Sequence, residues 1–163
     1  MISQTALTLL VSIAAVGAGL MAGIYFVFST FVMHALQELP QIDAAKVMNA
    51  INRVIQRSLF MPLFFGTTVL YAWLLYVASQ DYGSAGNLVL IMSAFSYVIG
   101  MFLITLVFNV PLNNKLARAE ASEDQLCETW QAYTVVWIRW NHVRTLCSLL
   151  CASLSVFYLV GYA

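Results

Sequence analysis

Long uncharged runs of apolar residues, each bounded by charged residues, dominate the pattern along the chain. A membrane-spanning helix needs about 20 predominantly apolar residues, and these runs predict spans at residues 7–33, 59–79, 88–110 and 143–163. No basic residue precedes the first run, and it is longer than the roughly 7 to 15 apolar residues of a secretory signal. It is therefore expected to be a retained span.

Four consecutive spans predict an all-α, polytopic membrane protein. Because irregular chain and open sheet edges do not survive in hydrocarbon, the spans are expected to form an antiparallel four-helix transmembrane bundle. Segments 34–58 and 111–142 are expected to be helical cytoplasmic extensions. Residues 1–163 are interpreted as one four-span membrane domain.

The basic residues fall on one side of the predicted bundle. All seven lysines and arginines lie in, or at the boundaries of, the two connecting segments, and none lies in the turn at residues 80–86. By the positive-inside rule, these segments face the cytoplasm and both termini lie on the non-cytoplasmic side. The expected location is the inner membrane of a bacterium, with the lipid bilayer as partner.

Composition excludes several function classes. The chain is 62% hydrophobic and 9% charged, whereas soluble domains carry about 25% charged residues. Its seven basic and seven acidic residues balance, which excludes a strongly basic nucleic-acid binder. No acidic residue lies within a predicted span, which argues against a proton-coupled transporter or pump.

Small residues form a face on the first span. Gly17, Gly19 and Gly23 allow close approach of another helix, and the last two have GxxxG spacing. We prefer the interpretation that these residues pack inside the bundle. Contact between two copies in a homo-oligomer stays an open alternative.

Each connecting segment predicts an amphipathic helix. In the first, Asp43 is a candidate N-cap, and helical spacing places apolar residues on one face; these are Val47, Met48, Ile51, Val54 and Ile55. The opposite face carries Lys46, Asn49, Arg53 and Arg57.

In the second segment, Ser122 and Gln125 have the spacing of a capping box. The helix is expected to run unbroken from there into the fourth span. One face carries Leu126, Trp130, Tyr133, Trp137, Trp140 and Arg144. From Trp130 to Arg144 this stripe is about 21 Å tall, too tall for one interfacial belt, so part of it is expected to line a packed interface or a pocket.

The string from Asn109 to Asn114 places three side-chain amides around Pro111 at the end of the third span. Proline disfavours a helical residue before it and removes a backbone donor, so the helix is expected to break or fray here. A polar rim that binds an oxygen-rich ligand and simple helix capping explain the string equally well.

A second polar group lies at the start of the fourth span. Arg144 is a fixed cation at the membrane boundary, where charge by default indicates function, although snorkelling toward phosphate is an ordinary alternative. Asn141 shares a helix face with Trp137 and Arg144. His142 can act as a general base, but a structural role is preferred for a single histidine.

Metal ligands are sparse in the sequence. The three cysteines form no CxxC motif, and no Glu and Glu-x-x-His set of a di-iron bundle is present. No metal site is predicted. Metal or haem held by His34 and His142 stays open as a third alternative, because both are expected at the cytoplasmic level.

Residues 109–117, Trp130 and residues 137–145 together resemble the anthrone oxygenase-like family of small membrane proteins, long catalogued as a domain of unknown function. The Gly-rich first span, which ends in residues 28–33, and the stretch Met48-x-x-Ile51-Asn52-Arg53 also resemble it. The resemblance implies a four-span membrane protein. Some members oxidise anthrones to anthraquinones with dioxygen and without flavin or haem.

The function that this resemblance implies is oxidation of an apolar polycyclic phenol, with dioxygen as co-substrate and no cofactor. A flat ring system would stack on Trp137 or Trp140. The hypothesis makes His142 the base and Arg144 the group that stabilises the substrate anion. The hydrogen-bond donors to substrate oxygens would be Asn109, Asn113 and Asn141. The alternative is a non-enzymatic ligand-binding or accessory protein whose Asn and Trp motifs are structural.

Overall fold

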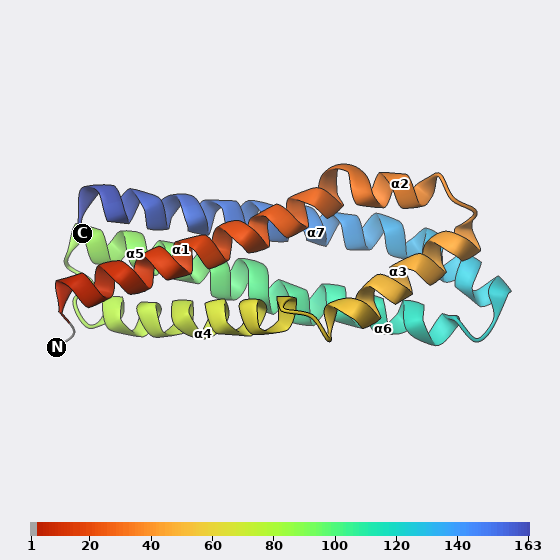
Figure 1. Ribbon diagram of the computed structural model, residues 1–163, viewed down its shortest axis with the longest axis horizontal. Helices are drawn as coiled ribbons and strands as arrows, with labels where there is room; N and C mark the ends of the chain where they lie inside the picture. The colour runs from red at the N-terminus through yellow and green to blue at the C-terminus, as the bar shows by residue number, and fades with distance from the viewer. Residues whose placement is uncertain (1–2) are drawn as a thin grey trace.

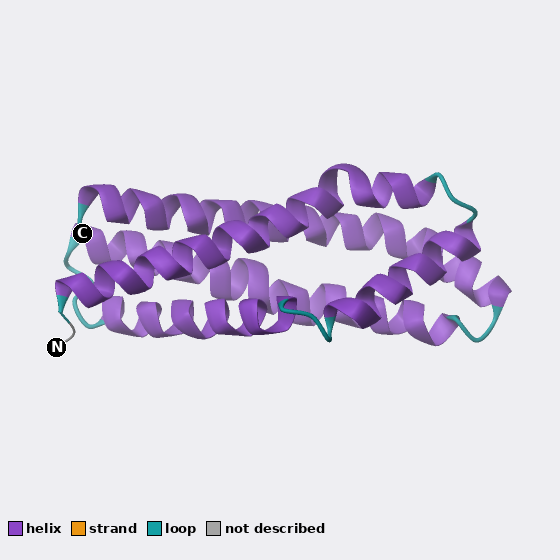
Figure 2. Ribbon diagram, viewed as in Figure 1, coloured by secondary structure: helices purple, strands orange, loops and turns teal. Residues whose placement is uncertain are grey.

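Residues 3–163 are described by a computed structural model, and every regular element in that part of the chain is a helix (Figure 2). Four helical segments lie side by side in alternating directions, with both termini at one end (Figure 1). The first segment consists of α1 (Gln4–Val27), the π-helical η1 (Phe28–Val32) and α2 (Met33–Gln37). The second is α4 (Phe60–Ser79), and the fourth is α7 (Glu123–Gly161). The third consists of α5 (Ala85–Phe95), the π-helical η2 (Ser96–Leu103) and η3 (Thr105–Asn109), and α6 (Val110–Ala119).

All four segments are long and apolar enough to cross a membrane, which confirms the predicted all-α membrane protein. The first and third predicted spans lie inside one segment each, and the second begins one residue before α4 and ends with it. The fourth lies within α7 except for its last two residues. The helix α3 (Gln41–Ile55) precedes α4 in the chain and lies past its N-terminal end, where it covers α6 and the first half of α7 (Figure 1). Helices α2, α3 and α6 and the first half of α7 form an extension of the bundle, which we call the helical extension.

Within residues 3–163, the buried apolar side chains form two hydrophobic cores. One lies between the four segments toward the termini and is built around Tyr71, Leu74 and Tyr97. The other lies in the helical extension, where Leu126 and Trp130 pack with residues of α2, α3 and α6. The prediction that part of the aromatic stripe lines a packed interface is thus confirmed.

The helix does not break at Pro111, contrary to the sequence-based expectation. The backbone widens into π-helical turns over Thr105–Asn109, and α6 continues directly from Val110. Pro111 is the second residue of α6 and directly follows these wide turns. The wide turns before it accommodate the ring without ending the helix.

Three local predictions were wrong. Ser122 precedes α7, but its side chain makes no capping hydrogen bond. Helix α3 begins at Gln41, ahead of the expected cap Asp43. Asn49 is buried and Val54 is exposed, the reverse of the predicted faces. Asn49 is buried because its Nδ2 donates to the Leu116 carbonyl and to Glu120 across the contact between α3 and α6.

The glycines of α1 divide into two kinds. A Cβ atom at Gly17 would collide with the side chain of Thr67 in α4, so the close approach of these helices requires glycine there. At Gly19 and Gly23 a Cβ would meet nothing within 4 Å. Packing inside the bundle therefore explains Gly17 but not the GxxxG pair.

Candidate functional site

A cavity of about 400 Å³ lies where the core between the spans meets the core of the helical extension. This volume is within the range of about 300 to 1,000 Å³ typical of small-molecule sites. Side chains from α1, η1, α3, α4, η3, α6 and α7 line it. Phe28 of η1 and Thr105 of η3 are among them, so π-helical turns, which frequently occur at functional sites, border the cavity on two sides.

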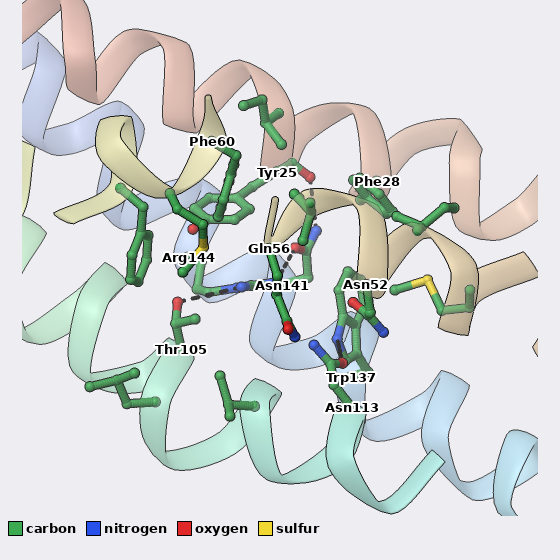
Figure 3. A pocket seen from close by; sticks show the side chains of 18 of the residues that line it. Tyr25, Phe28, Asn52, Gln56, Phe60, Thr105, Asn113, Trp137, Asn141 and Arg144 are labelled. Atoms are coloured by element: carbon green, nitrogen blue, oxygen red, sulfur yellow. Dashed lines mark hydrogen bonds between the residues drawn. The ribbon is translucent and has the colours of Figure 1, made fainter. Parts of the chain in front are cut away.

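Arg144 of α7 points its guanidinium into this cavity and is only 5% exposed (Figure 3). Its Nη2 donates to Oδ1 of Asn141 at 2.6 Å, and its Nη1 donates to Oγ1 of Thr105 at 3.4 Å. The guanidinium carbon lies 4.2 Å from the ring centroid of Tyr25 and 5.2 Å from that of Trp137. Two aromatic faces and two neutral oxygens thus surround the cation.

No carboxylate neutralises Arg144 within residues 3–163. The ion pairs in that part of the chain join Lys46 to Glu123 and Arg53 to Glu120, both in the helical extension, and no acidic side chain lines the cavity. Buried charges are ordinarily paired, because removing an ion from water is costly. Arg144 is therefore a buried cation without a counter-charge.

Asn141 is fully buried and all of its polar atoms are bonded. Its Nδ2 donates to the backbone carbonyl of Tyr25 at 2.8 Å and to Oγ of Ser29 at 2.7 Å, while its Oδ1 accepts from Arg144. The amide therefore joins α7 to α1 and η1 and holds the guanidinium in place.

Asn113 and Trp137 form the wall nearest the helical extension. Oδ1 of Asn113 accepts hydrogen bonds from the Tyr133 hydroxyl at 2.8 Å and from Nε1 of Trp137 at 2.9 Å. The Trp137 ring also packs against Phe28, with the centroids 5.7 Å apart. These bonds fix the indole ring at the edge of the cavity.

The cavity brings together four of the residues proposed from the sequence, namely Asn113, Trp137, Asn141 and Arg144. The other three are not among its lining residues. Asn109 is buried and donates to the Trp137 carbonyl at 3.4 Å. Trp140 stacks on Phe108 with centroids 3.7 Å apart, and His142 is exposed.

Sequence reasoning missed several lining residues, above all Tyr25, Asn52 and Thr105. Asn52 had a usable signal, because it lies four residues after Met48 and directly beside Ile51 on the apolar side of α3. Tyr25 and Thr105 had none, since each lies in a continuous apolar run and reaches the site only through the packing of α1 and η3 against α7.

The two histidines lie apart from the cavity. His34 is exposed, with Nδ1 2.8 Å from the Thr30 carbonyl oxygen, and His142 is exposed on α7. Over residues 3–163, no three His, Cys, Asp or Glu side chains are grouped as metal ligands would be.

The chain matches a model of a known protein family. The model of the anthrone oxygenase family matches residues 53–154, which is more than half of the chain. The matched region takes in Arg144, Asn141 and Trp137, whereas Tyr25 and Asn52 lie before it. Neither the curated proteins nor the solved structures gave a match.

Proposed function

The chain belongs to the anthrone oxygenase family, and on this premise we propose that it oxidises an apolar polycyclic phenol of the anthrone type with dioxygen, without flavin, haem or metal. The observation that carries the proposal is Arg144, a buried cation that faces a largely apolar cavity with aromatic side chains in its walls. A flat, apolar ring system can reach such a site from the lipid. The fixed positive charge then stabilises an anion formed from that ring system.

The reaction balances without a further reductant. The methylene carbon of the anthrone loses a proton, and the resulting delocalised anion combines with dioxygen and a proton to give a hydroperoxide. Loss of water then breaks the O–O bond, removes the second hydrogen from that carbon and leaves a carbonyl. One dioxygen is consumed, and one anthraquinone and one water are formed.

The side chains of the cavity divide this work. Trp137 and Phe28 supply aromatic surface for the rings. Arg144 lies where negative charge on a substrate oxygen is stabilised, held by Asn141 and Thr105. The base assignment to His142 stays a prediction, and its exposed position outside the cavity lining does not favour it.

Oxygen uptake tests the proposal directly. The purified protein in uncharged detergent is supplied with dithranol, a dihydroxy anthrone, while dioxygen and quinone absorbance are followed together. The expected result is equimolar uptake and quinone formation, with Arg144→Gln at least about 100-fold slower. Arg139→Gln, on an exposed position of the same helix, is the matched control. If the wild type does not exceed the uncatalysed rate, the proposal is wrong.

The same assay decides the role of His142. Because the histidine does not line the cavity, we expect His142→Ala to retain turnover. A loss as large as that of Arg144→Gln would support His142 as the base.

A specific observation favours the non-enzymatic alternative for the amides. Asn141 and Asn109 both tie α7 to neighbouring segments, as expected of structural residues. A ligand-binding or accessory protein would bind the polycycle in this cavity without consuming dioxygen.

For the location, we propose a bacterial inner membrane with both termini on the non-cytoplasmic side. The one-sided distribution of lysine and arginine supports this orientation. An alkaline phosphatase fused after Ala163 should then be active in the periplasm, and an inactive fusion would reverse the orientation.

A further inference from the structure

Arg144 carries a positive charge that no acidic side chain of the cavity neutralises. Its neighbours, Asn141, Thr105 and two aromatic rings, are all neutral. The cation–π contacts attract the guanidinium but leave its net charge in place. Whatever fills the cavity is therefore favoured if it carries one negative charge.

The unused hydrogen-bonding atoms of the cavity indicate the same kind of ligand. Among the lining residues, the buried atoms with no partner in the described part of the chain are Nε of Arg144 and Nδ2 of Asn52. Both are donors. The acceptor Oδ1 of Asn113 already receives two hydrogen bonds. A ligand that satisfies the cavity thus presents oxygen acceptors and has no need of a donor.

The two donors lie apart. Figure 3 shows Arg144 and Asn52 separated across the cavity, with Gln56 between them in this view. Apolar and aromatic side chains fill the space around them, among them Phe28, Phe60 and Trp137. A rigid ring system with one oxygen at each end matches this arrangement better than a compact anion.

The lining residues include no Asp, Glu, His, Lys or Cys side chain. A neutral phenol or carbon acid that enters would find no basic side chain to accept its proton. Arg144 offers another route, because a nearby opposite charge in surroundings of low polarity strongly favours the deprotonated form.

We propose that the cavity binds its ligand as a planar aromatic monoanion, with the charged oxygen at Arg144 and a second oxygen at Asn52. The ligand supplies the counter-charge that the bundle lacks, and its proton is released to water. The aromatic nature of the ligand rests on the proposed function. The selection of an anion rests on Arg144 alone.

The test uses a probe that is already oxidised, so that binding is measured without turnover. A monohydroxy anthraquinone, whose hydroxyl is remote from the carbonyls, is titrated into the protein in uncharged detergent. Its methyl ether, which has the same rings but no charge, is titrated in parallel. Absorbance reports whether the bound probe is phenol or phenolate.

The wild type should lower the pKa of the bound phenol by about one unit or more relative to empty micelles. It should bind the phenolate at least about tenfold more tightly than the methyl ether. Arg144→Gln should abolish both effects, Arg144→Lys should retain part of them, and Arg139→Gln should change neither. Equal affinity of the wild type for phenolate and ether, or an unshifted pKa, would overturn the proposal even if every Arg144 variant failed to fold.

Asn52 is tested with a second pair of probes. Asn52→Ala should weaken binding of the hydroxyanthraquinone by about tenfold. The corresponding hydroxyanthracene has no carbonyl oxygen, so its binding should not change. Equal losses for both probes would show that Asn52 only supports the fold.

The two proposals fail in different ways. Phenolate binding without dioxygen uptake from dithranol would overturn the oxygenase function and leave an anion-binding cavity. Turnover without preference for the phenolate would overturn the present inference and leave the oxygenase.

Discussion

The side-chain amide of Asn141 donates a hydrogen bond of 2.8 Å to the backbone carbonyl of Tyr25, so the amide that bonds to Arg144 is fixed to the backbone of the residue whose ring packs against Arg144. Tyr25 lies three residues before η1, and Ser29 of that π-helical segment accepts the second hydrogen of the same amide. The position of the buried cation thus depends on a joint between the first and the last helical segment.

Removal of this joint should weaken the fold. Asn141→Leu leaves the Tyr25 carbonyl and the Ser29 hydroxyl without the amide donor, and we expect the free energy of unfolding to fall by about 1 to 3 kcal/mol. Thermal unfolding in detergent measures this. The control is Asn114→Leu, at an exposed position one turn from Pro111 whose side chain makes no hydrogen bond in the structure. Equal stability of the two variants would contradict the structural role of Asn141.

An acidic side chain at position 141 should abolish the preference of the cavity for an anionic ligand. In Asn141→Asp, a carboxylate replaces the oxygen that lies 2.6 Å from Nη2 of Arg144, so the protein now supplies its own counter-charge. The variant should lose the preference for phenolate over methyl ether. Measurement is by the same titration of the hydroxyanthraquinone, and a preserved preference would show that the charge of Arg144 is not what selects the ligand.

The two tryptophans proposed from the sequence should respond differently to ligand. Trp137 lines the cavity, whereas Trp140 stacks on Phe108 outside it. Quenching of tryptophan fluorescence by the hydroxyanthraquinone should therefore shrink in Trp137→Phe and persist in Trp140→Phe. The reverse result would place the ligand on the outer face of α7.

Glycines on α1 provide a test of the helix packing. Gly17→Ala puts a Cβ against Thr67, and such overpacking should cost about 1 to 3 kcal/mol of unfolding free energy. Gly19→Ala, on the same helix with nothing within 4 Å, should change it by less than about 0.5 kcal/mol. The comparison is made by thermal unfolding of both variants, and a similar loss in both would mean that Gly19 also has a packing partner.

Much of the fold followed from the sequence because lipid imposes simple requirements on a chain. A span needs a minimum apolar length and must satisfy its own backbone, so the runs at residues 59–79 and 88–110 were sufficient to predict helices. The unbroken course of α7 followed in the same way, since nothing between Gln125 and Gly161 is glycine or proline. Part of the site followed as well, because the stripe on α7 places Trp137, Asn141 and Arg144 on one face.

The tertiary structure decided what these residues face. Sequence spacing gives the direction of a side chain from its own helix, but Tyr25, Asn52 and Thr105 come from three other segments, and their meeting depends on how helices pack. Pro111 shows where prediction from neighbouring residues fails. The proline predicted a break in the helix, but the π-helical turns of η3 precede it and the helix continues. The sequence therefore determined that a cation lies near the membrane boundary. The assembled bundle surrounds Arg144 with aromatic and apolar side chains, and no carboxylate is among the cavity's lining residues. Only this packing determined that the positive charge is not neutralised by the cavity and can pair with a ligand.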